Sequence, residues 1–375
     1  MPHTPNPGPG DDDRLDALPA PGPVYYAEQA LLGALLLEPH RRGEVTGLDA
    51  GSFSYAAHGA VFTAIRTLPA PDPVQHRRNT AWLNEVLDAA RRQARGLTGP
   101  YLHTLIRACP QPGHAAAYAA MVEADHARRA LRGRAQRLAQ TATDPALPDP
   151  VPAVLAEADA LAETVDKLGL RFPPQPGPPP RTPAPPPRLH PDGREEALAE
   201  ERLLLATATT HPAEIEQMRW LTNSDFTHPF HAGLWTCLTA LNRRGVPIDP
   251  VTVLWEAQQR GLMTEVVSAE LLDGLSVPAD SATYCGERVL QRAVLATAHE
   301  VGRQVEAFTA DPATTPYQLV LGSRRALADL SAVRSRWTLA TAPAVPVAKS
   351  ARARSSAPPR AGPPRTAAPP VRISR

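Results

Sequence analysis

Two histidines at matching positions are the residues whose type and spacing first suggest chemistry. Each follows a phenylalanine by five residues and precedes another aromatic residue by four, in the series Phe53, His58, Phe62 and Phe226, His231, Trp235. An imidazole is a common metal ligand, so the pair raises the hypothesis of a metal site. However, no acid or cysteine joins either histidine at ligand spacing, and the following aromatic residue shares its helical face. We therefore favour a structural histidine near a helix start, and we predict no metal and no cofactor.

Acidic residues near the start of each half could act as catalytic carboxylates. Glu28 lies in the stretch Ala-Glu-Gln-Ala-Leu-Leu-Gly-Ala that begins at Ala27, and Glu200 and Glu201 lie in a similar stretch that begins at Ala199. Acids in the first turn of a helix are favourable against the helix dipole without any catalytic role. We therefore predict no catalytic residue at these positions.

A cluster of five arginines in the first half could bind phosphate groups. The cluster comprises Arg128, Arg129, Arg132, Arg134 and Arg137. Glu123 and Asp125 precede it at helical spacing, so a solvated face of mixed charge is the favoured alternative.

Signatures of nucleotide hydrolysis are missing from the sequence. A P-loop requires a lysine followed by serine or threonine, because that lysine reaches the phosphates that the loop cradles. Of the two lysines, Lys167 precedes Leu168, and Lys349 precedes Ser350 but has Pro343 where the first loop glycine would stand. His-Glu-x-x-His, Gly-x-Ser-x-Gly and Gly-x-Gly-x-x-Gly motifs are also absent, so we expect a protein that is not an enzyme.

The 44 prolines divide the 375-residue chain into segments. Proline runs favour extended, solvated polyproline II over packed structure, and the prolines concentrate near the two ends and in the middle. We therefore predict a disordered segment 1–23, a folded domain 24–172, a proline-rich linker 173–191, a second folded domain 192–340 and a disordered basic tail 341–375.

Charge and apolar runs indicate the cellular setting. The longest uncharged apolar run, Ala30 to Leu37, is far shorter than the roughly 20 residues that a bilayer span needs. The N-terminus carries acids where a secretory signal would carry positive charge, so we expect a cytoplasmic protein that does not enter a membrane. Residues 1–348 hold 32 basic against 38 acidic residues, and this balance does not support DNA binding by the folded part.

The two predicted domains resemble each other, which indicates an internal repeat. Their opening stretches align at an offset of 172, which matches Glu28 with Glu200, and the Phe-x4-His-x3-aromatic spacing aligns at 173. Further along, Arg-Gly-Leu at 95–97 matches the same tripeptide at 260–262, and Tyr118 matches Tyr284, at offsets of 165 and 166. The fall in offset predicts eight extra residues in the first domain, in a loop near 73–79.

Apolar residues recur at spacings of three and four almost throughout, and no long period-two run rich in β-branched residues occurs. We therefore predict an all-α fold of two tandem helical domains, each a small globule followed by a helical hairpin. Apolar stripes at 290–308 and 319–337 flank a turn at 309–316, and helices at 118–138 and 154–168 flank a turn at 144–152. Each hairpin could pair with itself or with a second hairpin.

These positions carry a family resemblance. The stretch Ala-Glu-Gln-x-Leu-Leu-Gly-x-Leu-Leu-Leu, followed by Phe53, His58 and Phe62, resembles the N-terminal domain of the bacterial replicative helicase DnaB. The second domain is similar to it through Phe226, His231, Trp235, the run 245–254, the tripeptide 260–262 and Ala282-x-Tyr284. The resemblance implies two tandem, divergent copies of that domain without the RecA-like motor.

In that family the N-terminal domain is a scaffold that does not hydrolyse ATP. It consists of a helical globule and a hairpin that dimerises, in a collar where primase and loading factors dock. The resemblance therefore implies a non-catalytic, replication-associated protein that binds replisome proteins, namely a replicative helicase, a primase or a loader. Self-association or internal pairing of the two domains would use the hairpin stripes, from which we select the candidate interface residues Leu290, Val294, Val301, Leu327, Leu330 and Val333.

The tail offers an alternative function. Residues 349–375 hold seven basic residues and no acid, so this segment could make weak, salt-sensitive contact with nucleic acid or could merely solubilise the chain. The candidate nucleic-acid contacts are Arg352, Arg354, Arg360 and Arg365.

Overall fold

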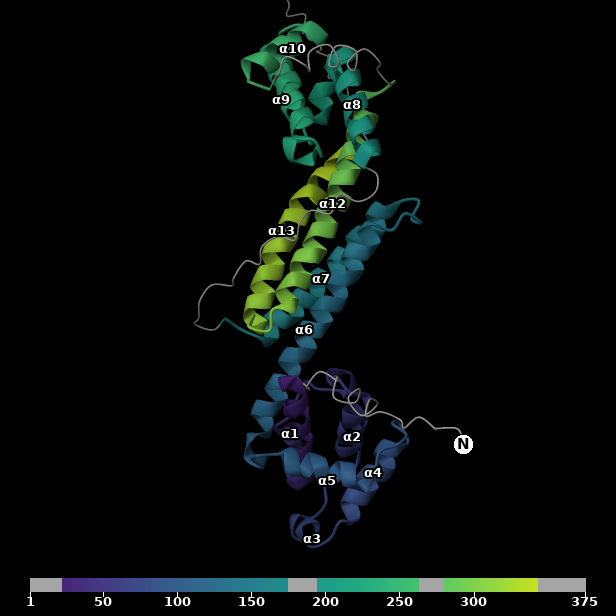
Figure 1. Ribbon diagram of the computed structural model, residues 1–375, viewed down its shortest axis with the longest axis vertical. Helices are drawn as coiled ribbons and strands as arrows, with labels where there is room; N and C mark the ends of the chain where they lie inside the picture. Colours follow the sequence, from purple (N-terminus) through teal and green to yellow (C-terminus); the bar gives the residue numbers. More distant parts are fainter. Residues whose placement is uncertain (1–21, 175–193, 263–279, 343–375) are drawn as a thin grey trace, which may run out of the picture. The chain divides into compact units, whose positions relative to one another are not determined.

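The computed structural model describes residues 22–174, 194–262 and 280–342 (Figure 1). Within these ranges every regular element is helical, which confirms the predicted all-α class. The predicted disordered ends and linker lie outside the described residues except at their edges, and so do all four candidate nucleic-acid contacts of the tail.

The first globule consists of short helices around one apolar core. Its elements are α1 (Pro23–Leu37), η2 (Pro39–Gly43), η3 (Ala50–Ser52), α2 (Ala56–Thr67), α3 (Pro73–Arg78), α4 (Ala81–Arg91), α5 (Gly99–Ala108) and η4 (Pro112–His114). The extra residues predicted near 73–79 form the short helix α3 rather than an open loop, because Asp72 caps its first amides and Pro73 starts it.

Helix α1 is the centre of this globule. Leu31, Leu32 and Leu35 are fully buried, and the buried residues from Ala27 to Leu36 cover nearly the whole circumference of the helix. Gly33 permits close contact with α5, since a Cβ at this position would lie only 2.2 Å from the carbonyl oxygen of Leu105. The packing of α1 against α5 therefore depends on a residue without a side chain.

The second globule repeats this plan with fewer described elements. They are α8 (Arg194–Thr210), η5 (Pro212–Met218), η6 (Asn223–Asp225), α9 (Pro229–Arg244) and α10 (Pro250–Gln259). Gly245 ends α9 in the left-handed conformation, with φ of 65°, and Asp249 then caps α10 by accepting from the amides of Val251 and Thr252. Trp235 on α9 is buried at the centre of the apolar core.

Each globule is followed by a helical hairpin, as predicted. The first consists of α6 (Ala115–Ala142) and α7 (Pro150–Arg171), and the second of α12 (Ala282–Ala310) and α13 (Pro316–Ala340) (Figure 1). The hairpins do not form separate cores. One apolar cluster draws on all four helices, with Leu138 from α6, Leu161 from α7, Val305 from α12 and Leu330 from α13.

The cores also cross the predicted boundary between the two halves of the chain. Val151 and Leu155, at the start of α7, pack in the core of the second globule together with Val333 of α13.

Among the described helices, none is both long enough and apolar enough to cross a bilayer.

Candidate functional site

A buried carboxylate and a buried histidine form a pair inside the first globule. One carboxylate oxygen of Glu28, on α1, lies 2.5 Å from Nδ1 of His58, in the first turn of α2. The other oxygen accepts a hydrogen bond from the backbone amide of Ser54 at 2.6 Å. Neither Glu28 nor His58 is exposed to solvent. The pair thus joins α1 to the start of α2, where the helix has free amides and where negative charge is favourable.

The second globule contains the same arrangement. Glu201 on α8 lies 2.6 Å from Nδ1 of His231 on α9, and its other oxygen accepts from the amide of Thr227 at 2.5 Å. Glu201 therefore occupies the position of Glu28, at an offset of 173. The sequence alignment that matched Glu28 with Glu200 was wrong by one residue, because it followed the similarity of short sequence stretches and not the buried face of the helix.

Glu200 lies instead on the side of α8 that faces α12. Its carboxylate binds both Arg288, at 3.1 Å, and Arg292. Burial favours the neutral form of Glu200, but its hydrogen bonds to these two guanidinium groups outweigh the burial and hold its pKa below the usual range. These ion pairs connect α8 of the second globule to the N-terminal part of α12, where the hairpin begins.

Aromatic rings surround the first histidine. The rings of Tyr25, Tyr55 and Tyr101 lie with their centroids 5.3 to 6.3 Å from that of His58, and burial raises the pKa of Tyr101 to about 12. The Nε2 atom of His58 is buried and has no hydrogen-bond partner among the described residues. No group of three or more potential metal ligands occurs in the described part of the chain. The pair is thus placed to hold two helices together inside an apolar and aromatic environment.

The two hairpins pack against each other through α6 and α12. The buried residues of α6 recur on α12 at an offset of 167, so that Leu131, Ala135 and Leu138 correspond to Ala298, Gly302 and Val305. A Cβ at Gly302 would lie 2.7 Å from the carbonyl oxygen of Ala135, its equivalent residue. Equivalent residues that touch each other are typical of an isologous, two-fold contact, here formed within one chain.

The arginines of α6 bind the end of the partner hairpin. Arg128 donates to the carbonyl oxygens of Thr309, Asp311 and Thr314 at 3.1, 2.6 and 2.5 Å. Arg132 donates to the same carbonyl of Thr309 at 2.7 Å. Cations are favourable at the C-terminus of a helix, where the last carbonyls have no helical partner. Part of the predicted solvated face is therefore an interhelical contact.

Helices α7 and α13 run antiparallel beside this contact and are bridged by two ion pairs. Asp166 of α7 lies 3.0 Å from Arg324 of α13, and Asp159 accepts two hydrogen bonds from Arg334. The hydrogen bonds that Arg334 donates to Asp159 raise the pKa of Arg334 above its usual value. Between the ion pairs lies a groove of about 290 Å³ with apolar residues such as Leu327 in its lining.

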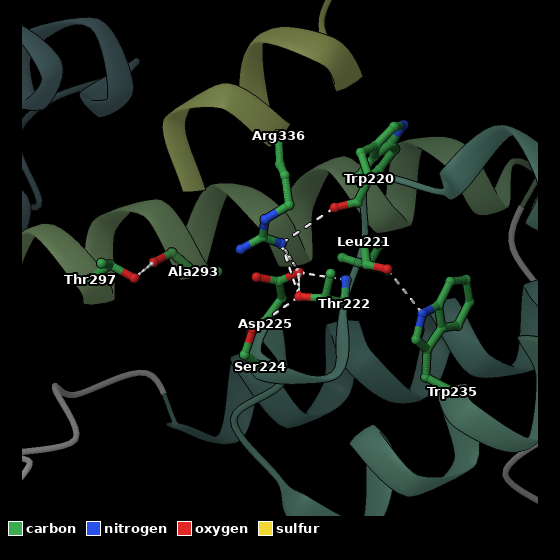
Figure 2. Close-up of polar contacts among 9 residues, drawn as sticks. All are labelled: Trp220, Leu221, Thr222, Ser224, Asp225, Trp235, Ala293, Thr297 and Arg336. Carbon is green, nitrogen blue, oxygen red and sulfur yellow. Dashed lines mark hydrogen bonds and ion pairs between the residues drawn. The ribbon is translucent and has the colours of Figure 1, made fainter. Parts of the chain in front are cut away.

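An arginine near the end of each hairpin binds back to its own globule. Figure 2 shows Arg336 of α13 donating to the carbonyl of Trp220 at 3.3 Å, to the hydroxyl of Thr222 at 3.0 Å and to the carboxylate of Asp225. Asp225 also accepts from the amide of Thr222, which closes the turn. Its side chain is only 1% exposed, so the guanidinium compensates a buried negative charge.

Arg171 has the corresponding role in the first half. It lies at the end of α7 and donates to the carbonyl of Thr46 at 3.2 Å and to the carboxylate of Glu123. Gly47, beside this carbonyl, has a φ of 81°, and a Cβ there would lie 2.7 Å from the guanidinium. The positive φ therefore favours glycine at this position, and a side chain there would also have to displace the Arg171 guanidinium.

The predicted interface residues all lie on the second hairpin and pack within the chain. Five of them are buried and Leu327 is partly buried. Leu290, Val294 and Val333 belong to the core of the second globule, whereas Val301, Leu327 and Leu330 pack in the core that the four hairpin helices share.

Sequence reasoning missed the pairing partners of the polar residues that join these elements. Glu201 and Arg336 each contact residues far away in the chain, and no local pattern marks such a pairing. The repeated Phe-x4-His spacing was a usable signal for the histidine, because a buried histidine near a helix start requires an acceptor and each half offers a glutamate on its first helix.

Comparison with known proteins gives a family for this arrangement. The model of the DnaB-like helicase N-terminal domain matches residues 23–124 and 194–288, which together make up just over half of the chain. Replicative DNA helicase DnaB of Mycobacterium leprae (strain TN) is 31% identical over 117 residues, which are 30% of this chain and 19% of that helicase. No solved structure gives a significant match.

The matched ranges coincide with the repeated geometry. Each begins at the first helix of a globule, at α1 or α8, and ends within the first helix of a hairpin, at α6 or α12. Each range also contains one buried glutamate–histidine pair, Glu28 with His58 or Glu201 with His231. The chain belongs to the DnaB-like helicase N-terminal domain family.

Proposed function

We propose that this protein is a non-catalytic component of DNA replication in the cytoplasm, a scaffold that binds replisome proteins. The observation that carries the proposal is the family match on both halves of the chain, in a sequence that offers no P-loop lysine. The replicative helicase, the primase or a helicase loader are the partners that this family membership favours. The protein itself turns over no ATP.

The scaffold contains two copies of the family domain, paired with each other. Two observations support this organisation. The glutamate–histidine pair recurs at one offset of 173, and the hairpins contact each other through equivalent residues of α6 and α12. One chain then offers two globules, held together by a shared hairpin core, to its partners.

A capture experiment tests the proposal. The purified chain is immobilised, and the cognate replicative helicase and primase are passed over it, each alone and then together. We expect at least one of them to be retained specifically and no ATP hydrolysis by the chain alone. A twin truncated after Ala348 should retain the same protein, because the folded part carries the interaction.

The basic tail supports a second candidate function, contact with nucleic acid. Its seven basic residues without an acid would give an affinity that falls steeply with salt. Binding of double-stranded DNA at two salt concentrations, by the full chain and the truncated twin, separates the two functions. DNA binding by the full chain alone, with neither replication protein retained by either form, would replace the scaffold proposal with the tail function.

A further inference from the structure

The charged residues that face each other between α7 and α13 differ between the two hairpins, although the buried residues of these helices correspond. Buried residues of α7 recur on α13 at an offset of 165: Val154, Ala158, Leu161 and Val165 correspond to Leu319, Ser323, Ala326 and Leu330. At the same offset Asp159 corresponds to Arg324. Position 159 of one hairpin is thus acidic where the equivalent position of the other is basic.

This difference matters because the helices meet in an antiparallel, two-fold manner. Asp166 faces Arg324, and Asp159 faces Arg334, so both contacts join an acid of α7 to a base of α13. In a pairing of two first hairpins from different chains, the residue facing Asp166 would be the equivalent of Arg324, which is Asp159. In a pairing of two second hairpins, Arg334 would face Arg324. Both alternatives place like charges opposite each other.

We propose that these four charges make the first hairpin select the second hairpin and reject a second copy of itself. The apolar stripes of the two hairpins are similar, so the packing of these stripes discriminates weakly between the three pairings. At the contact of α6 with α12, a pairing of two first hairpins would also place Ala135 where Gly302 has no Cβ. Like charges placed opposite each other disfavour the wrong partner, whereas the correct pairing gains two ion pairs. The surface between the hairpins is therefore specific for one partner, the other half of the same chain. This inference concerns the pairing alone and does not depend on which replication protein the chain binds.

Arg128 adds to this selection. It donates to carbonyls at the turn between α12 and α13, and at the offset of 167 its equivalent is Leu295. In a pairing of two second hairpins, a leucine would face these carbonyls and leave them without that donor. The pairing of two second hairpins is thus disfavoured by this contact as well as by charge.

Two double variants of the full chain test the proposal with identical composition and net charge. Asp159→Arg with Arg324→Asp exchanges equivalent positions, so the pairing within the chain becomes repulsive at both contacts, while each pairing of like hairpins becomes attractive. Asp159→Arg with Arg334→Asp exchanges the two members of one ion pair, so both contacts within the chain remain attractive. All four side chains are between 43% and 71% exposed, so neither variant disturbs the core.

The readouts are the molar mass by light scattering over a range of protein concentrations and the unfolding temperature in low and high salt. We expect the first variant to unfold at a lower temperature than the second in low salt, and its mass to rise with concentration as chains exchange hairpins. In high salt the difference between the unfolding temperatures of the two variants should become small, because salt screens exposed charges. Equal unfolding temperatures in low salt together with equal masses at every concentration would overturn the proposal.

Discussion

Gly302 of α12 lies against Ala135 of α6, and the two residues are equivalents of each other in the two hairpins. A Cβ at Gly302 would lie 2.7 Å from the carbonyl oxygen of Ala135 and 2.9 Å from the amide nitrogen of Ala139. Backbone therefore meets backbone at this point. The pairing of the hairpins depends on the absence of a side chain at one residue, in the same way that close helix packing generally depends on small residues.

Substitution of that glycine should separate the hairpins. Gly302→Val places two methyl groups against the backbone of α6, and overpacking of this kind costs about 1 to 3 kcal/mol of the free energy of unfolding. We expect a clear fall in the midpoint of urea unfolding. Gly133→Ala on α6 is the control, since a Cβ there would approach only the guanidinium of Arg137, at 3.9 Å. An equal fall in both variants would contradict the proposed close contact.

The glutamate–histidine pair should contribute strongly to stability because it is buried. Glu28→Gln keeps the size of the side chain but removes the charge that His58 and the amide of Ser54 face. Hydrogen bonds to charged groups contribute about 1.5 to 3 kcal/mol each, so we expect a loss in this range by chemical denaturation. Glu163→Gln on α7, whose side chain is 67% exposed, is the control and should leave the free energy of unfolding almost unchanged, because exposed ion pairs contribute little.

Arg128 should be the most important of the five clustered arginines. Arg128→Ala leaves the carbonyls of Asp311 and Thr314 without this donor, whereas the carbonyl of Thr309 keeps its hydrogen bond from Arg132, and we expect a loss of about 2 kcal/mol in the free energy of unfolding. Arg128→Lys should restore only part of it, because an ammonium group cannot present the planar fork of a guanidinium. Arg134→Ala, on the same helix, should have an effect within about 0.5 kcal/mol. Similar effects at both arginines would favour a general charge effect over the specific contact.

Stability should decline at alkaline pH because of a buried thiol. Burial raises the pKa of Cys237 from 9.0 to about 11, so the folded protein keeps this proton over a range in which the unfolded chain has lost it. The contribution of the thiol is complete below pH 9 and is lost as the pH rises to about 11, at a cost of about 2 kcal/mol. Cys237→Ala should flatten the decline of the unfolding free energy over this range. An unchanged slope would show that other groups cause the decline.

Helix content and hairpins could be predicted from the sequence because they depend on local periodicity. The observed α12 and α13 include the stripes predicted at 290–308 and 319–337, whereas the residues near 73–79 that were predicted as an inserted loop form the helix α3. The partner of each hairpin could not be predicted, since similar apolar stripes fit several pairings. Charges at positions such as Asp159 and Arg324 distinguish these pairings, but their significance is visible only once the antiparallel register is known.

The alignment of the opening helices shows the same limit. Glu200 and Glu201 are neighbours in the sequence, yet one binds arginines of α12 and the other binds His231 inside the globule. A shift of one residue rotates a helix position by about 100°, so it exchanges an inner for an outer face. Only the three-dimensional contacts distinguish the two glutamates.

The attachment of Arg336 to Asp225 also has a consequence for biosynthesis. The second globule receives residues from α7, which is made before it, and from the last turns of α13, which are made after it. When only the residues up to about 300 have left the ribosome, the second globule still lacks Val333 from its core. It also lacks Arg336, the cation that balances the buried carboxylate of Asp225. The second half of the chain can complete its fold only when synthesis has passed Arg336, whereas the core of the first globule is complete once Val122 has emerged.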